Sequence, residues 1–446
     1  MFDGILKKTF IYGTLLYLFF IPVIKGYNEI IFAINYFSLF MFCAVAFYLS
    51  KKDELFFTAK HLGVIVFLYS VFHIFIYNVI SYYYNNNFFV FSEADALLYD
   101  YEASRMSNMG LINGINYYLH RHESEDLGIV FILSNIYRFV ESKFAYNFYN
   151  AIIGTVVAVH IYKICKYIMS DKNAFLCALT YSISSYVLWF HSSGLKESTL
   201  VALIVLTFYH YYNFHKNKKP YSLILGILCL VSILFFRPAL MFIVVASIAI
   251  GILFSRKASA GSVILIILLM VSVVISFAFI NSIADRFLLG SSEEMLASKE
   301  SEGMIKGGVT FTYFINVLAS TLGPLPTILP TKPLLSFYSS GLIFKIFISI
   351  VFWLGVIYSF KVSNKFLYPV IIFVLIEMVA LAYILESLEL RKSLTHFPFI
   401  FITAFWFIDF YNREKALPAK KKREIQKLVN VYMFVFLVLI AYWNFR

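Results

Sequence analysis

The sequence contains few charged residues and few cysteines, and each shortage excludes a class of protein. Charged side chains make up 14% of the 446 residues and hydrophobic side chains 61%, whereas a soluble domain is about half apolar. An ordinary soluble protein is therefore excluded. The cysteines all lie in or beside apolar runs, at Cys43, Cys165, Cys177 and Cys229. Neither a disulfide framework nor a zinc-binding spacing follows from these positions.

Other patterns are missing too. The sequence shows no internal repeat, no low-complexity tract and no nucleotide-sugar motif. Its first apolar run follows Lys7 and Lys8 without a small-residue cleavage site, which predicts a retained membrane span rather than a removed signal peptide. The absence of repeated halves argues against a transporter, because transporters typically pair broken helices from two repeats at mid-membrane.

Long apolar runs dominate what is present, and the mean hydropathy is +0.79. A helix of such residues crosses the roughly 30 Å of membrane hydrocarbon. The fold class we predict is an all-α polytopic membrane protein, with a single integral membrane domain over residues 1–446. We place about thirteen spans of this kind near residues 9–25, 29–49, 62–85, 144–167, 172–192, 197–214, 220–236, 238–255, 262–282, 335–360, 366–386, 397–411 and 428–445.

The formal net charge of +12 is not a nucleic-acid signal here. Basic residues gather in alternate joining segments, as expected where cytoplasmic loops carry the excess of Lys and Arg. These segments are 50–61, 163–172, 215–219, 256–257, 361–365 and a basic cytoplasmic loop at 412–427. We therefore place the N-terminus inside and the C-terminus outside, and we expect membrane lipids rather than nucleic acid as partners.

Two long segments fall on the predicted outer side. The first, residues 86–143, concentrates charge, and the second, residues 283–334, bears glycine and proline. Residues 127–140 of the first segment are apolar but short, so we expect a helix that dips into the membrane from outside. Residues 311–329 of the second contain Gly323 and two prolines and are expected to be re-entrant or interfacial. Non-helical backbone at that depth has to be buried in protein or line a cavity.

The first outer loop begins with an acidic stretch of mixed character. Apolar residues between Ala96 and Ala103 predict a short helix on the membrane surface. Asp95 falls at or near the N-terminus of this helix. There it either caps the helix or presents an acid at the membrane boundary.

The same stretch carries a resemblance to a known family. Asp95 is followed four residues later by Tyr99, and Ala103 comes four residues after that. This pattern in the first large outer loop resembles the polyprenyl-phosphate-sugar-dependent glycosyltransferases of the GT-C superfamily, which include lipid A aminoarabinose transferases and protein O-mannosyltransferases. The resemblance covers roughly residues 60–215. It implies a GT-C-like helix bundle in which Asp95 is catalytic and Tyr99 contacts the substrate.

The family also bears an acid in a second outer loop, at the start of the following span. Glu197 occupies the similar place here, after the Gly194 turn and next to Lys196. The resemblance therefore implies a catalytic role for Glu197 and a substrate-binding role for Lys196. The alternative is a charged pair that anchors a span end at the membrane interface.

The chain also departs from the family pattern. The second acid that usually follows the first-loop aspartate is replaced by Ala96. In the aminoarabinose-transferase branch a charged pair followed by proline closes the loop, whereas Glu125 and Asp126 are followed here by Leu127. Both departures concern the specificity of that branch rather than the general reaction.

Several outer-side cations are candidates for binding a phosphate. Arg237 separates two closely spaced spans, Arg391 precedes another span together with His396, and Arg105 lies within the first loop. A guanidinium suits phosphate because it donates two parallel hydrogen bonds and stays charged at a membrane boundary. The alternative for each is contact with lipid headgroups through a long side chain.

Two further features have a binding and a structural interpretation. The segment from His120 to Asp126 is rich in His and acidic residues, but it shows no metal-ligand spacing. We assign no metal to it, although a divalent cation is conceivable in principle, and a solvated polar turn is the alternative. Glu377 lies within a predicted span, where ionisable residues are costly and often functional. Lys345 on the preceding span is a candidate partner.

These features predict a membrane glycosyltransferase that moves a sugar from an undecaprenyl-phosphate-linked donor to a glycan or lipid acceptor. The site is expected on the outer face of a bacterial cytoplasmic membrane, in the synthesis of a surface polysaccharide. A polymerase of the Wzy type, which joins whole O-antigen or capsule repeats, shares the same features. A transporter or flippase for lipid-linked glycans is a third alternative.

Overall fold

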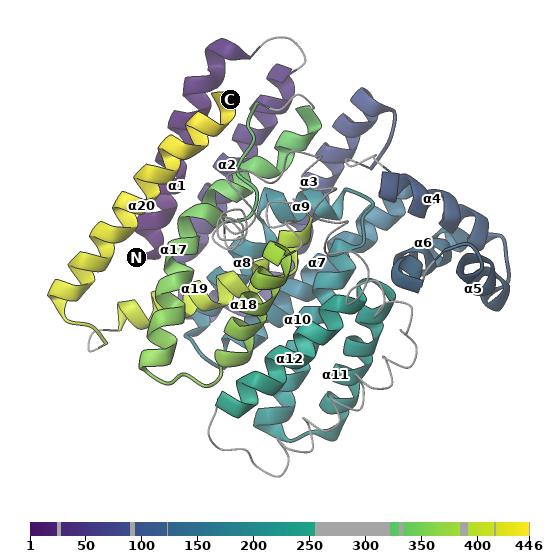
Figure 1. The fold of residues 1–446 in the computed structure, drawn as a ribbon. Helices are drawn as coiled ribbons and strands as arrows, with labels where there is room; N and C mark the ends of the chain where they lie inside the picture. The colour runs from purple at the N-terminus through teal and green to yellow at the C-terminus, as the bar shows by residue number, and fades with distance from the viewer. Residues whose placement is uncertain are drawn as a thin grey trace.

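The computed structural model describes residues 1–24, 28–89, 94–122, 124–254, 322–329, 333–383, 391–413 and 416–445. Over this part of the chain the structure consists of helices joined by turns and contains no strand (Figure 1). The prediction of an all-α fold is thus confirmed for the described residues.

One side of the helix bundle combines the two ends of the chain. The first three helices are α1 (Phe2–Phe20), α2 (Asn28–Ser50) and α3 (Ala59–Asn85). α1 packs against α2, against α17 (Ser339–Lys361) and against the last helix, α20 (Ala419–Phe445). α20 therefore lies along the outside of this side of the molecule, next to α1 (Figure 1).

The other helices fill the middle and the opposite side (Figure 1). They are α7 (Lys143–Cys165), α8 (Asp171–Ser182), α9 (Ser185–His191), α10 (Glu197–Asn217), α11 (Pro220–Ser232), α12 (Pro238–Phe254), α18 (Tyr368–Tyr383) and α19 (Phe397–Asn412). α17 and α19 are central. In their most apolar stretches 83% and 94% of the residues are buried, whereas the corresponding share for α20 is 17%.

Fewer helices have membrane-spanning length than the thirteen spans expected from the apolar runs. Seven described helices are long and apolar enough to cross a membrane, or eight if α8 and α9, which meet at 54°, form one bent span. The predicted spans at 220–236, 238–255 and 366–386 are shorter apolar helices of 10–17 residues. α10 is not among the seven, and the predicted span at 262–282 lies outside the described residues.

Predicted basic segments that the structure describes lie near one another at one end of the bundle, whereas 256–257 falls outside the described residues. Lys51 forms an ion pair with Asp3, the Tyr162 hydroxyl donates to the Phe57 carbonyl, and the Ser170 hydroxyl donates to Asp409 at 2.6 Å. Each contact joins two segments far apart in sequence. The alternation of basic and non-basic connections thus corresponds to two ends of one bundle, as expected for a protein that crosses a membrane repeatedly.

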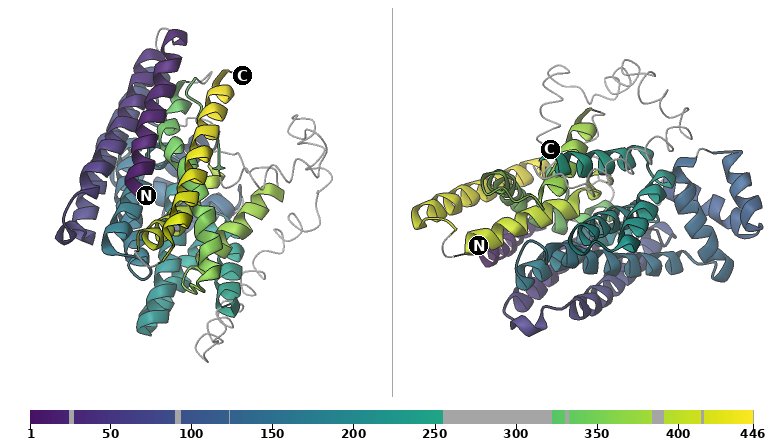
Figure 2. Two further views of the ribbon diagram at one scale, coloured as in Figure 1. Left: turned by 90° about the vertical axis from the view of Figure 1, so that its left-hand side faces the viewer. Right: turned by 90° about the horizontal axis from the view of Figure 1, so that it is seen from below.

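The first long loop forms a group of short helices at the other end (Figures 1 and 2). It contains α4 (Ala94–Ser107), α5 (Leu111–Leu119), the 3-10 turn η3 (Ser124–Asp126) and α6 (Leu127–Phe139). The helix predicted to begin near Asp95 is present as α4, and its place on the membrane surface stays a prediction. The predicted helix over 127–140 is confirmed as α6, which packs against α4. Its relation to the membrane remains a prediction.

The second long loop, 283–334, lies mostly outside the described residues. Its described part, 322–329, is largely non-helical and largely buried. The Asn444 side chain accepts hydrogen bonds from the backbone of Ile328 at 2.6 Å and Leu329 at 3.1 Å, and it donates to the Pro326 carbonyl at 2.8 Å. These contacts satisfy backbone groups that would otherwise be unpaired in an apolar setting.

The two ends of the bundle are predicted to lie on opposite sides of the membrane. Asn108→Cys in the α4–α5 loop and Lys365→Cys between α17 and α18 both replace exposed residues. We expect a membrane-impermeant thiol reagent to label the first in intact cells and the second only after lysis, because the Lys-rich end faces the cytoplasm. The unsubstituted chain is the control for the native cysteines, and labelling of both sites in intact cells would contradict the topology.

Candidate functional site

The Asp95, Tyr99 and Ala103 pattern lies on one face of α4. Residues four apart in a helix lie above one another, and this face turns toward the protein, since Tyr99 is 2% exposed and Ala103 is fully buried. Asp95, in the first turn of the helix, stays 39% exposed at its side chain. The spacing thus places one accessible carboxylate above a buried phenol.

A glycine turn brings a second carboxylate to the same region. Gly194 has φ +76°, and a Cβ atom there would lie 2.5 Å from the Phe89 ring. The Tyr146 hydroxyl fixes the turn by donating to the Leu195 carbonyl at 3.1 Å. Glu197 then begins α10, where the positive end of the helix dipole favours a carboxylate.

Two ion pairs connect this turn to other segments. Lys196, 8% exposed, pairs with Asp126 at the end of η3. Glu197, 1% exposed, has its Oε1 atom 3.2 Å from Nη2 of Arg237, which lies just before α12. The adjacent residues Lys196 and Glu197 therefore hold partners from two different parts of the chain.

A third ion pair joins the first loop to the last third of the chain. Arg391 donates to Asp95 through its Nη1 atom, although the two residues are 296 positions apart. Arg391 precedes the short 3-10 turn η7 (Lys392–Leu394) and α19. The resemblance and the arginine pattern pointed to these two residues separately, and the structure places them in contact.

Tyr99 links the three carboxylates. Burial raises the pKa of the Tyr99 phenol well above its usual value, and the negative charges of Asp126, Asp95 and Glu197 raise it further. The phenol therefore remains protonated and neutral at any physiological pH. Because these three acids act on one buried phenol and each has a cation as its partner, we call Asp95, Tyr99, Asp126, Lys196, Glu197, Arg237 and Arg391 the charged cluster.

The charged cluster is electrically balanced but not fully saturated. Its three carboxylates face three cations. The second carboxylate oxygen of Glu197, Oε2, is buried and accepts no hydrogen bond from the described residues. A buried charged oxygen without a donor is unfavourable, and a ligand hydroxyl placed beside it would remove that penalty.

Two predicted site residues lie outside the charged cluster. Arg105 is on the exposed side of α4, where it donates to the Tyr117 hydroxyl at 3.0 Å and stacks over the Tyr101 ring at 4.4 Å. His396 is fully buried, with Nδ1 3.6 Å from Oε2 of Glu377. Arg105 and His396 are therefore not counted among the members of the charged cluster.

The expected pairing of Glu377 with Lys345 is replaced by another. The Thr395 hydroxyl donates a hydrogen bond to Oε1 of Glu377. Nδ1 of His396 lies 3.6 Å from Oε2 of the same carboxylate. Both partners follow Arg391 by only a few residues, which sequence periodicity within α17 and α18 could not indicate.

Sequence reasoning missed the role of Asp126. Its signals were a charged pair without the proline of the aminoarabinose branch and a place at the end of the polar segment from His120 to Asp126. The partner of Asp126 comes from another loop through Lys196. The neighbouring Asp100 was also unassigned; it accepts from the Tyr137 hydroxyl at 2.6 Å and pairs with Lys143 at 2.9 Å, and these contacts hold α4, α6 and α7 together.

No metal site was found among the described residues, where no three His, Cys, Asp or Glu side chains gather closely enough. In the polar turn from His120 to Asp126, His122 lies 3.1 Å from Glu102. The turn is thus tied to α4 by an ion pair when the histidine is protonated.

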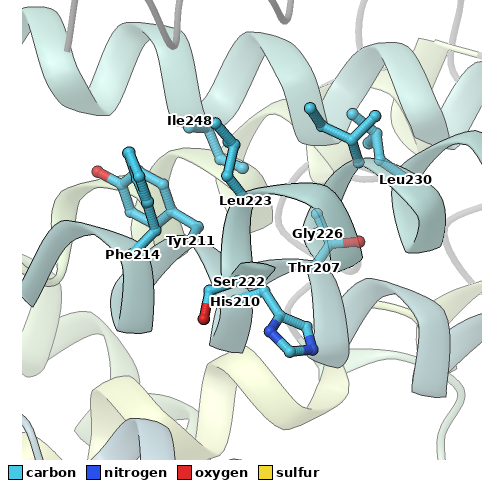
Figure 3. Close-up of a pocket in the computed structure, with 10 residues that line it drawn as sticks. Thr207, His210, Tyr211, Phe214, Ser222, Leu223, Gly226, Leu230 and Ile248 are labelled. Atoms are coloured by element: carbon cyan, nitrogen blue, oxygen red, sulfur yellow. The ribbon is translucent and has the colours of Figure 1, made fainter. Parts of the chain in front are cut away.

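Two cavities lie elsewhere in the described part of the chain. One of about 30 Å³ lies between α10, α11 and α12 beside His210 and Leu223 (Figure 3), with room for about one water molecule. Another of about 270 Å³ lies between α1 and α2. No residue of the charged cluster lines either cavity.

Comparisons with known proteins identify no relative: no protein-family model matches the chain, and no curated protein matches it. The function of the chain is therefore inferred from its residues and their geometry.

The Gly194 turn predicts a stability effect. Gly194→Ala forces a β-carbon into a left-handed conformation and into the Phe89 ring, which should destabilise the protein by roughly 1–3 kcal/mol. A lower midpoint of thermal unfolding of the purified protein measures this. Gly4→Ala is the matched control, because a β-carbon there meets nothing within 4 Å. Equal midpoints for the two variants would contradict the structure of the turn.

Proposed function

We propose that the chain is a membrane glycosyltransferase. It transfers a sugar from an undecaprenyl-phosphate-linked donor to a hydroxyl of a glycan or lipid acceptor. The charged cluster is the active site, and it faces the outside of a bacterial cytoplasmic membrane in the pathway to a cell-surface polysaccharide.

One observation carries the proposal: Asp95, the acid of the family-like pattern, contacts Arg391, a predicted phosphate ligand. A glycosyl transfer from a lipid phosphate needs a base beside the acceptor and a cation beside the leaving phosphate. These two groups have to lie within one substrate length of each other. The adjacent pair of Glu197 and Arg237 supplies a second acid and a second guanidinium.

The position of the charged cluster suits an amphiphilic donor. The cluster lies at the non-basic end of a bundle whose helices are long and apolar. A polyprenyl chain is soluble in hydrocarbon, whereas its phosphate and sugar are not. Such a donor can keep its tail in the bilayer while its phosphate reaches Arg391 at the membrane boundary.

The reaction that follows is a single displacement. The acceptor oxygen attacks the anomeric carbon and its proton passes to the Asp95 carboxylate. The bond between the anomeric carbon and the phosphate oxygen breaks, and polyprenyl phosphate leaves with the electron pair. Arg391 and Arg237 stabilise the negative charge that develops on the phosphate. The anomeric configuration is inverted.

The resting ion pair gives this mechanism an order. Arg391 cannot satisfy both Asp95 and a phosphate with the same nitrogen atoms. Donor binding therefore draws the guanidinium toward the phosphate and leaves Asp95 available as a base. Glu197, with its unsatisfied Oε2 atom, is suited to orient the acceptor by receiving a hydrogen bond from one of its hydroxyls.

A repeat-unit polymerase of the Wzy type is the second candidate. The same groups would act on a donor that carries a whole oligosaccharide on diphosphate. The side chain of Asp95 is half-exposed, which leaves the base open to a large acceptor. This exposure favours the polymerase. A flippase needs no base and would not depend on Asp95.

The first functional test concerns Asp95. Asp95→Asn keeps the size of the side chain but removes the base, so we expect turnover of undecaprenyl-phosphate sugar to fall by about 10²–10⁴-fold. Sugar transfer by purified protein in detergent is the measurement. Asp53→Asn, at an exposed position of the basic end, is the matched control. Wild-type turnover by Asp95→Asn would remove Asp95 as the base.

The second test separates the arginines. Arg391→Ala should raise the KM for the lipid donor, because a phosphate ligand is lost, and should also lower kcat, because a cation that stabilises the leaving phosphate is lost. Arg105→Ala removes a guanidinium from the same loop end but outside the charged cluster, and we expect its kinetics to stay unchanged. If both variants behaved alike, Arg391 would be no more than a lipid-headgroup contact.

The two candidate reactions differ in their products. A deletion strain complemented with wild type or with Asp95→Asn is compared on a gel of surface glycan. Full-length chains with altered mobility in the variant indicate a missing single sugar and support the transferase. A single unpolymerised repeat supports the polymerase, and an unchanged profile contradicts both.

A further inference from the structure

A buried lysine lies outside the charged cluster. Lys345, in the second turn of α17, is 0% exposed. Its ammonium has neither a hydrogen bond nor an ion pair with any of the described residues. Burying an unpaired charge is strongly unfavourable, and ionisable residues inside a membrane bundle usually mark a function.

The surroundings of the ammonium compensate its charge only in part. It lies 5.3 Å from the centre of the Phe397 ring and 5.8 Å from that of Tyr186, and aromatic faces attract cations weakly. On another side it touches Gly323, where φ is +66° and a Cβ atom would lie 2.0 Å from Nζ. Only glycine lets the backbone approach the ammonium so closely.

Lys345 is near the segment that supplies Arg391. A Cβ atom added at Gly323 would also lie 3.2 Å from the Ser393 hydroxyl, and that hydroxyl is 2.6 Å from the Tyr186 hydroxyl. Ser393 follows Arg391 by two residues. Lys345 is six residues from the start of α17 at Ser339, or about 9 Å along the helix. Lys345 therefore lies nearer to the non-basic start of α17 than to its Lys361 end.

We propose that Lys345 is a second cation for the phosphate of the lipid-linked donor. The inference rests on the proposed function and extends it, because it assigns an anion site that combines Lys345 with the Ser393 hydroxyl near Arg391. The four rotatable bonds of the lysine side chain let its ammonium leave Gly323 for a phosphate at Ser393. The aromatic rings of Tyr186 and Phe397 then face the first apolar units of the chain.

A phosphate explains why the lysine has no protein partner. Glu377, the acid that the sequence suggested as its partner, accepts a hydrogen bond from Thr395 and lies 3.6 Å from His396, and no ion pair joins it to Lys345 among the described residues. A cation held for a ligand has to be free of carboxylates before the ligand arrives. The unliganded protein then carries an unfavourable charge, and donor binding relieves it.

For Lys345→Met we expect opposite effects on stability and on ligand binding. The substitution keeps an unbranched side chain of similar length and removes its charge. Without ligand the thermal midpoint of the purified full-length protein should equal or exceed that of wild type, because replacing a buried charge by an apolar group is often stabilising. With undecaprenyl phosphate the dissociation constant should rise by about 10–100-fold.

The experiment measures the shift of the thermal midpoint in detergent during titration with undecaprenyl phosphate. Undecaprenol, phosphatidylglycerol and inorganic phosphate are titrated in parallel to separate the tail, any lipid phosphate and free phosphate. Lys361→Met, at the other end of the same helix, is the matched control and should bind as wild type does. Ser393→Ala is a second variant with intact charge, and its binding should weaken severalfold.

The outcomes separate this inference from the proposed function. If wild type binds undecaprenyl phosphate and Lys345→Met binds it equally well, the lysine site is wrong and the function stands. If undecaprenyl phosphate does not stabilise wild type, the proposed function itself is contradicted. Equal stabilisation by phosphatidylglycerol would overturn the assignment to the donor. A lower midpoint of unliganded Lys345→Met would mean that the lysine supports the fold, which also contradicts the proposal.

Discussion

The structure depends on the rule that charges in an apolar bundle have to be paired. Three carboxylates from α4, η3 and α10 meet three cations from the turn before α10, the segment before α12 and the segment before α19. Each pair joins parts of the chain that no helix connects directly. The ion pairs thus determine how the loop of short helices sits on the bundle, and they bring reactive groups together for the same reason.

This balance has a chemical meaning. A site whose cations are all engaged binds an anion by exchange, so its affinity is the difference between two sets of contacts. That arrangement disfavours weakly charged or misplaced ligands, since they cannot replace the carboxylates they displace. Lys345 differs from the other cations because no described carboxylate has to be displaced from it.

Local patterns were predictable from the sequence, and long-range contacts were not. The apolar residues between Ala96 and Ala103 predicted a short helix, because helical periodicity acts over a few residues. The pairing of Asp95 with Arg391 depends on how distant helices pack, which periodicity does not encode. The apolar runs predicted about thirteen spans, whereas seven of the described helices, or eight with α8 and α9 as one span, have spanning length. Hydropathy alone did not show that the helices at 220–235 and 238–254 are short.

The wide separation of the paired residues also governs when the site comes into being. Asp95 and Arg391 are 296 residues apart, and a ribosome adding roughly 5–20 residues per second needs about 15–60 s to cover that distance. Asn444, which holds the 322–329 turn, is made later still. Asp95 is therefore synthesised well before its partner. The charged cluster is complete only after the late segment before α19 has been added to the chain.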